Sequence, residues 1–133
     1  MSLNAYKSAH KRAESPRQAE YRLFAEVTAA LAEAKRIEAR GAALVEALDW
    51  NRRLWSTLAA DCGAPGNALP RELRAQIISV GLWVSRYATE VARGQADIDA
   101  LIDVNRSIME GLAMLPAATL PDNRHAASVA AHA

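Results

Sequence analysis

The sequence has three histidines and one cysteine, the side chains that most readily bind transition metals or supply a thiolate nucleophile. His10, His125 and His132 lie in the terminal segments, and none pairs with a glutamate within a core helix to build a carboxylate-bridged metal site. Cys62 lies on an apolar helical stripe far from any histidine in the sequence, so we expect a buried thiol. Glycine-rich phosphate loops and nucleophile elbows are missing. We therefore expect a protein that is not an enzyme and uses no metal or cofactor.

Two asparagines interrupt apolar stripes in the middle of predicted helices. The neighbours of Asn51 and Asn105 along each stripe are apolar, and a buried amide without a partner costs about 1–3 kcal/mol. Either the two amides bond each other or a backbone group and fix the helix register, or each meets the backbone of a ligand at an interface. We favour the first alternative.

Large apolar side chains also stand beside the main stripes. On the third predicted helix, Ile78 and Leu82 lie almost opposite the stripe, on a face that would meet water in a four-helix bundle. Either this helix is central and buried on two sides, or a contiguous apolar patch is exposed for a partner. Aromatic side chains at a patch rim are common at interface hot spots, which favours the partner. The predicted partner-binding residues are Trp50, Leu54, Ile78, Leu82 and Trp83.

The N-terminal segment carries an excess of basic side chains. Lys7, Lys11, Arg12 and Arg17 are candidates for contact with RNA phosphates. The segment lacks interleaved exposed aromatic residues and any known RNA-binding motif, so a solvated helix end is the favoured interpretation. The formal net charge of the whole chain is +1, which provides no strong field toward nucleic acid or membrane.

The helices that position these residues are marked by start and stop signals. The segment from Ser15 to Gln18 is a strong helix start, because Ser15 can cap the first turn, Pro16 suits the first helical position and Gln18 completes a capping box. Gly63 stands where a left-handed residue after a helix is expected. Four amphipathic helices are predicted, over about Pro16–Ile37, Ala42–Cys62, Arg71–Arg93 and Ala96–Leu115.

The second and third apolar stripes advance in alternating steps of four and three residues, which favours near-antiparallel packing in a bundle. No alternating run indicates a strand. We therefore predict an all-α antiparallel bundle of four main helices in a domain of residues 1–115. A shorter N-terminal helix over about Leu3–Arg12 would be marginal alone. Residues 116–133 lack an apolar stripe and are predicted to be a disordered tail.

The composition agrees with a small helical protein that stays in the cytoplasm. The chain has 133 residues, enough for one core, and is rich in Ala and Leu. A single cysteine excludes an internal disulfide. The N-terminus is polar and lacks the apolar region of a signal peptide, and no stretch approaches the roughly 18 apolar residues of a membrane span.

Two blocks of the sequence resemble the FlaF family of flagellar biosynthesis regulators. The first contains Asn4-Ala5-Tyr6, Glu14-Ser15-Pro16-Arg17 and Leu23-Phe24. The second runs from Leu101 to Leu112 and contains Asp103-Val104-Asn105-Arg106-Ser107. The spacing of Trp50 and Trp55 and the sequence Gly81-Leu82-Trp83-Val84 also fit the family. The resemblance extends from about Leu3 to Leu112.

The resemblance implies a role in flagellum assembly, through post-transcriptional control of flagellin and alongside a second regulator, FlbT. It implies no catalytic residues and no cofactor. Together with the spare apolar face it predicts a chaperone or adaptor that binds flagellin and controls its synthesis or export, because flagellin carries amphipathic terminal helices that a groove can accept. The alternative is an RNA-binding translational regulator that acts on flagellin mRNA through the basic N-terminal face.

Overall fold

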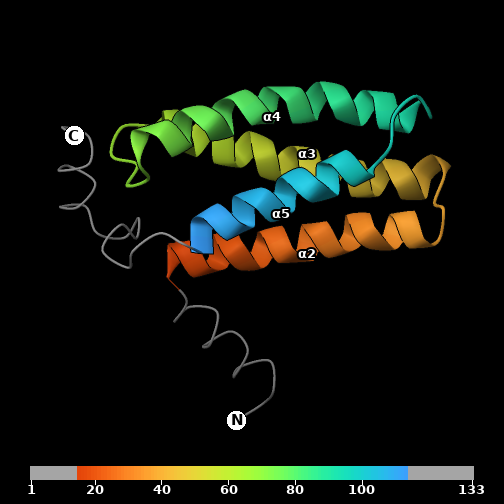
Figure 1. The fold of residues 1–133 in the computed structure, drawn as a ribbon, viewed down its shortest axis with the longest axis horizontal. Coiled ribbons are helices and arrows are strands. Elements are labelled where there is room, and N and C mark those ends of the chain that lie inside the picture. Colours follow the sequence, from red (N-terminus) through yellow and green to blue (C-terminus); the bar gives the residue numbers. More distant parts are fainter. Residues whose placement is uncertain (1–14, 114–133) are drawn as a thin grey trace, which may run out of the picture.

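The computed structural model describes residues 15–113, and these residues form four helices and no strand (Figure 1). Helix α2 spans Pro16–Arg36, α3 spans Gly41–Gly63, α4 spans Arg71–Ala92 and α5 spans Asp99–Ala113. The predicted all-α fold is confirmed. The short helix predicted over about Leu3–Arg12, the domain boundary at residue 115 and the predicted tail lie outside the described residues.

Successive helices run antiparallel, as the stripes predicted (Figure 1). The most extensive pairing is between α3 and α4, and α2 packs on both α3 and α5. Among the described helices, α4 and α5 are not a closely packed pair although they follow each other in the chain. The bundle is therefore more open along its α4–α5 side.

The capping box predicted at the start of α2 is present. The Gln18 backbone N–H donates to Ser15 Oγ at 3.1 Å, and the Ser15 backbone N–H donates to Gln18 Oε1 at 3.0 Å. These two bonds satisfy donors that a helix start leaves open. Helix α2 consequently begins at the residue expected, Pro16.

Two local predictions were wrong by a few residues. Helix α5 begins at Asp99 and not near Ala96. The side chain of Asp97 accepts a hydrogen bond from the Asp99 backbone N–H at 2.9 Å, as in an Asx-turn. This turn places the start of the helix after Asp97. Gly63 is the last residue of α3 and is not left-handed. The positive φ in that loop belongs to Gly66, at 84°.

The core is an apolar cluster to which all four helices contribute. Phe24 and Trp55 meet edge to face at its centre, with ring centroids 5.5 Å apart. Helix α4 lies against α3 at Gly81, where a Cβ would stand 3.4 Å from the Ala59 Cβ, at ordinary van der Waals contact. Cys62 is buried in the cluster, as predicted.

A buried polar layer crosses this core, formed by Thr28 of α2, Asn51 and Trp55 of α3, and Asn105 of α5. The Asn105 amide donates to Asn51 Oδ1 at 2.8 Å and to Thr28 Oγ1 at 3.1 Å. Its carbonyl oxygen accepts from Trp55 Nε1 at 2.8 Å. Thr28 in turn donates to the Phe24 carbonyl at 2.6 Å. One amide therefore links three helices.

This polar layer decides between the two interpretations of the asparagines. Asn51 and Asn105 are both 0% exposed and bond each other, so the pairing prediction is confirmed and the ligand-contact alternative is wrong. A polar contact satisfied at only one relative position of the helices favours a single register. Asn51 Nδ2 has no hydrogen-bond partner among the described residues, although it is buried.

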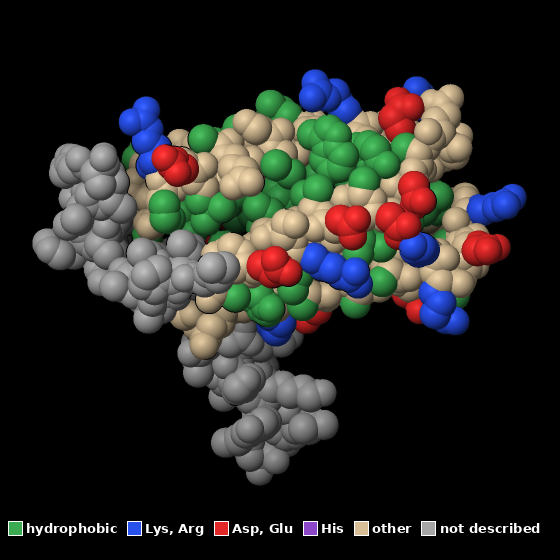
Figure 2. Space-filling model, in the orientation of Figure 1, with side chains coloured by type: hydrophobic (Ala, Val, Ile, Leu, Met, Phe, Trp, Pro, Cys, Tyr) green, Lys and Arg blue, Asp and Glu red, His purple; other side chains and the backbone are tan. Residues whose placement is uncertain are grey.

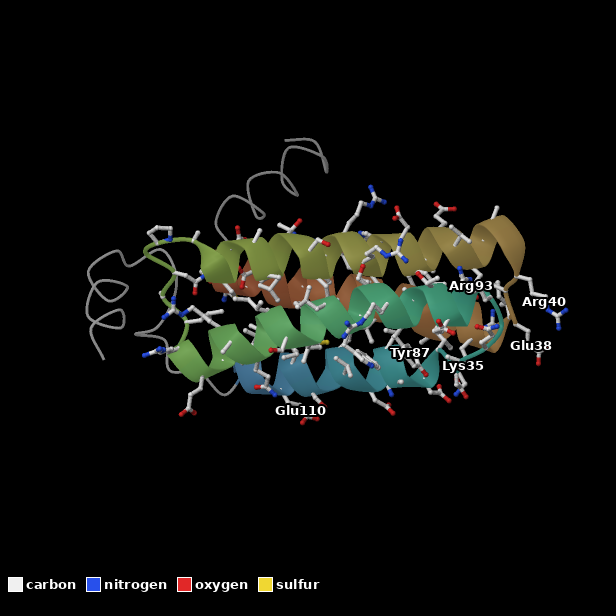
Figure 3. The ribbon with its side chains drawn as sticks, turned by 90° about the horizontal axis from the view of Figure 1, so that it is seen from above. Lys35, Glu38, Arg40, Tyr87, Arg93 and Glu110 are labelled. Carbon is white, nitrogen blue, oxygen red and sulfur yellow. The ribbon has the colours of Figure 1, made fainter. Side chains whose placement is uncertain are left out.

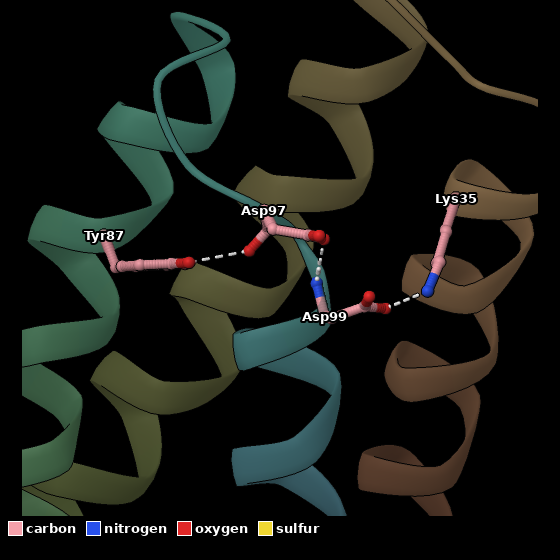
Figure 4. A network of polar contacts seen from close by, with 4 residues as sticks. All are labelled: Lys35, Tyr87, Asp97 and Asp99. Atoms are coloured by element: carbon pink, nitrogen blue, oxygen red, sulfur yellow. Dashed lines mark hydrogen bonds and ion pairs between the residues drawn. The ribbon is translucent and has the colours of Figure 1, made fainter.

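A chain of polar contacts ties α4, α5 and α2 together at one end of the bundle (Figure 4). Tyr87 donates to the Asp97 carbonyl at 2.8 Å, and Lys35 Nζ donates to a carboxylate oxygen of Asp99. The Asp99 hydrogen bond raises the pKa of Lys35 above its ordinary value of 10.5. The charges of Asp97 and Asp103 act in the same direction.

We expect Asp99→Asn to return the pKa of Lys35 toward its ordinary value. The contact with Asp99 raises the pKa of Lys35 in the folded state. The stability that this contact gives the fold is therefore fully present below the unfolded-state pKa of Lys35, and it is lost as the pH rises through the folded-state pKa, which lies above 10.5. An NMR titration of the Lys35 side chain measures this directly. Glu110→Gln, which removes a carboxylate well away along α5, is the control (Figure 3). Equal titration of Lys35 in wild type and Asp99→Asn would contradict the assignment.

Candidate protein-binding surfaces

The five residues predicted to bind a partner do not form one contiguous exposed patch, because Leu54 is buried in the core and the others are divided between surfaces. Their role in partner binding stays a prediction. Trp50 and Leu54 of α3 line a groove shared with α2. Ile78 and Leu82 of α4 do not line this groove. Trp83 stacks on Tyr87, with ring centroids 4.6 Å apart. Consecutive helical residues point about 100° apart, so Leu82 and Trp83 point in different directions.

The groove between α2 and α3 consists of two adjoining cavities. The first has a volume of about 330 Å³ and is lined by Glu20, Leu23, Phe24, Trp50, Arg53, Leu54, Thr57, Leu58 and Asp61. The second has a volume of about 350 Å³ and is lined by Ala30, Ala43, Glu46, Ala47, Trp50 and Arg53. Trp50 and Arg53 line both cavities, so we treat the two cavities as one groove, the α2–α3 groove.

Residue size explains why the α2–α3 groove is open. Alanines occupy α2 at position 30 and α3 at positions 43 and 47, so neither helix fills the space between them there. Trp50 stands between the two cavities with 36% of its surface exposed. Leu54 is 8% exposed and belongs to the core, so it forms part of the floor. The groove thus combines an apolar floor with one accessible aromatic side chain.

Charged side chains stand along the α2–α3 groove in a definite order. Glu46 lies at one end, Arg53 at the middle, and Asp61 with Glu20 at the other end. Arg53 Nε also contacts Asp49 Oδ2 at 3.1 Å, in an ion pair between exposed side chains. Sequence reasoning missed these charged residues, because Glu46, Arg53 and Asp61 lie at exposed positions of α3 and Glu20 is only half-buried.

The second apolar surface is the outer face of α4. Leu82 is 64% exposed and Ile78 is 36% exposed. Helix α4 is therefore not buried on two sides, and the prediction that apolar side chains remain exposed there is confirmed for these two residues. This face carries two large apolar side chains that the bundle leaves in water.

A third surface lies between α4 and α5, where Figure 2 shows a band of hydrophobic side chains. It encloses a cavity of about 250 Å³, lined by Leu73, Gln76, Val80, Asp103, Val104, Ser107, Ile108 and Gly111. Trp83 and Tyr87 stack further along α4 and are partly buried. Leu73, Val80 and Tyr87 follow one another in helical steps of seven along one side of α4 and pack at the edge of the core. They are only partly covered because α5 leans toward α2 and leaves this side open.

The basic residues proposed for RNA contact cannot be placed as one surface. Lys7, Lys11 and Arg12 lie outside the described residues, and Arg17 lies in the first turn of α2. The RNA-contact assignment stays a prediction.

The surfaces of the described residues present apolar side chains together with charged ones, which are the groups used in protein–protein recognition. In this part of the chain no cluster of histidine, cysteine and acidic residues could hold a metal ion. None of its four helices combines the length and the apolar character of a membrane span.

Comparison with known proteins gives one match. Neither the curated proteins nor the solved structures contained a match to this chain. The family model described as flagellar protein FlaF matches residues 2–112, which include all of α2, α3 and α4 and nearly all of α5. This match confirms the resemblance seen in the two sequence blocks. The chain therefore belongs to the FlaF family of flagellar proteins.

Proposed function

We propose that this FlaF-family protein binds flagellin in the cytoplasm as a chaperone or adaptor, and controls flagellin synthesis or export after transcription. The proposal assigns it no catalytic step. The binding site is the α2–α3 groove, and the bound element is an amphipathic helix of flagellin. Recognition of an amphipathic helix in an apolar groove is a common mode of binding.

The observation that carries this proposal is the accessible Trp50 above an apolar floor. The two cavities run from Asp61 to Ala43 along α3, which is about 27 Å at a rise of 1.5 Å per residue. That length suits a helix of about five turns. Tryptophan beside a desolvated pocket is the side chain most often found at interface hot spots.

The outer face of α4 is available to a second partner at the same time. Leu82 and Ile78 lie apart from the α2–α3 groove, so a protein bound there would not displace the flagellin helix. The proposed occupant of this face is the regulator FlbT. A protein that holds both partners could couple flagellin supply to the regulator.

A direct binding measurement tests the proposal. Purified protein is titrated into labelled flagellin from the organism that encodes it, with and without RNase, and binding is followed by fluorescence anisotropy. We expect saturable binding that RNase leaves unchanged, and only a shallow dependence on salt because apolar burial dominates. Absence of binding would refute the chaperone proposal. Binding that requires RNA and weakens steeply with salt would favour the mRNA-binding alternative through Lys7, Lys11, Arg12 and Arg17.

A further inference from the structure

We infer that the α2–α3 groove selects its ligand by charge order. It fits a flagellin helix that presents a basic, then an acidic, then a second basic residue along one edge of its apolar face. The inference rests on the proposed function for the identity of the partner. The selectivity of the groove comes from the charged side chains that line it.

The charges of the groove alternate in sign along its length. Glu46 lines the second cavity, Arg53 lines both cavities, and Asp61 with Glu20 lines the first. A helix that lies along the groove therefore passes an acidic, a basic and an acidic position. Complementary charges on the bound helix gain attraction at each position, and like charges on it are repelled.

The spacing of these charges suits a helical ligand. Glu46 and Arg53 are seven residues apart on α3, and Arg53 and Asp61 are eight apart, or about 10 and 12 Å along the axis. A nearly parallel ligand helix has the same rise, so residues about two turns apart on one face reach these positions. Because the charge order is the same from either end, it selects the pattern and not the direction of the ligand.

The ion pair between Arg53 and Asp49 does not prevent this selection. The side chains of Arg53 and Asp49 are 71% and 49% exposed, and exposed pairs of this kind contribute little to stability. Arg53 can therefore exchange Asp49 for an acidic residue of the ligand at small cost.

Two synthetic helical peptides of equal net charge test the inference. Both carry the same leucine and alanine face. One has lysine, glutamate and lysine along its edge, and the other has glutamate, lysine and glutamate, with compensating charges on the opposite face. We expect the first peptide to bind about tenfold more tightly at about 0.05 M salt, since each exposed pair contributes a few-fold. The ratio should shrink to about twofold near 0.5 M salt through screening.

A charge reversal at the centre of the groove locates the effect. The preference is measured here with two peptides that share the outer lysines and differ only at the central position, glutamate or lysine, and in Arg53→Glu the preference for the central glutamate should invert. Arg86→Glu makes the same change at an exposed position of α4 that lines none of the three cavities, and it should leave the preference as in wild type.

The outcomes separate this inference from the proposed function. Equal affinity for both peptides, or an Arg53→Glu variant with wild-type preference, would overturn the charge-order inference even while flagellin still binds. Failure of both peptides to bind, with flagellin binding intact, would overturn it as well. Failure of flagellin itself to bind would instead refute the proposed function.

Discussion

Replacing Asn105 with alanine is expected to lower the free energy of unfolding by about 3–5 kcal/mol, the largest effect of any single polar substitution in the bundle. The substitution removes three hydrogen bonds at once, to Trp55 Nε1, Asn51 Oδ1 and Thr28 Oγ1. Each buried group left without a partner costs about 1–3 kcal/mol. Urea unfolding followed by far-ultraviolet circular dichroism measures the change.

Two comparisons make the Asn105 prediction specific. Arg106→Ala alters an exposed neighbour on the same helix and should change stability by no more than about 0.5 kcal/mol. Combining Asn105→Ala with Trp55→Phe should cost less than the sum of the single changes, because both remove the same 2.8 Å bond. Strict additivity would show that this bond contributes nothing.

Replacing Trp50 with alanine is expected to weaken flagellin binding by about 30-fold while the bundle stays folded. Trp50 is 36% exposed and lines both cavities of the groove. Truncation of a hot-spot tryptophan typically costs about 2 kcal/mol or more of binding free energy. Anisotropy titration with labelled flagellin gives the affinity. Circular dichroism checks that the helix content is unchanged.

Leu82→Ala is the matched control for the Trp50 prediction. Leu82 is the most exposed of the large apolar side chains described, at 64%, but it lies on the outer face of α4. Its truncation should change flagellin affinity by less than about twofold, as expected outside a hot spot. A large loss with Leu82→Ala and none with Trp50→Ala would move the flagellin site to the outer face of α4.

The polar layer and the groove are physically connected. The α2–α3 groove exists only while α2 and α3 keep one register, and the layer joins Thr28 of α2 to Asn51 of α3 through Asn105. A groove formed before the ligand arrives avoids part of the ordering cost of binding. Asn105→Ala should therefore also weaken flagellin binding at temperatures where the variant is still folded.

Local signals in the sequence were enough to predict the helices. The capping box of Ser15 and Gln18 and the steps of the apolar stripes involve residues within one or two turns of each other. A capping box and an apolar stripe make the same local contacts in most helical proteins, so both can be recognised without knowing the rest of the fold. The same locality explains the error at Asp99, because the turn before α5 is also shaped by Tyr87, which donates to Asp97 from the preceding helix.

Pairings between distant residues could be only partly predicted. Asn51 and Asn105 stood out as polar positions on apolar stripes, and hydrogen bonding between them was one of two alternatives. The choice required knowing that α5 lies against α2 and α3 at that level, and that the Trp55 indole supplies the remaining donor. No local pattern encodes a contact between residues so far apart in the chain.

The sequence by itself determined that this protein is a helical bundle with more apolar surface than four regular stripes require. Only the tertiary structure decided where that surface lies. Trp50 and Leu54 lie one turn apart on the same side of α3, yet Leu54 is 8% exposed and Trp50 is 36% exposed at a groove edge. The physical reason is that burial depends on the size of the side chains across the interface, here the alanines of α2 and α3. Helical periodicity gives the direction of a side chain but not what it meets there.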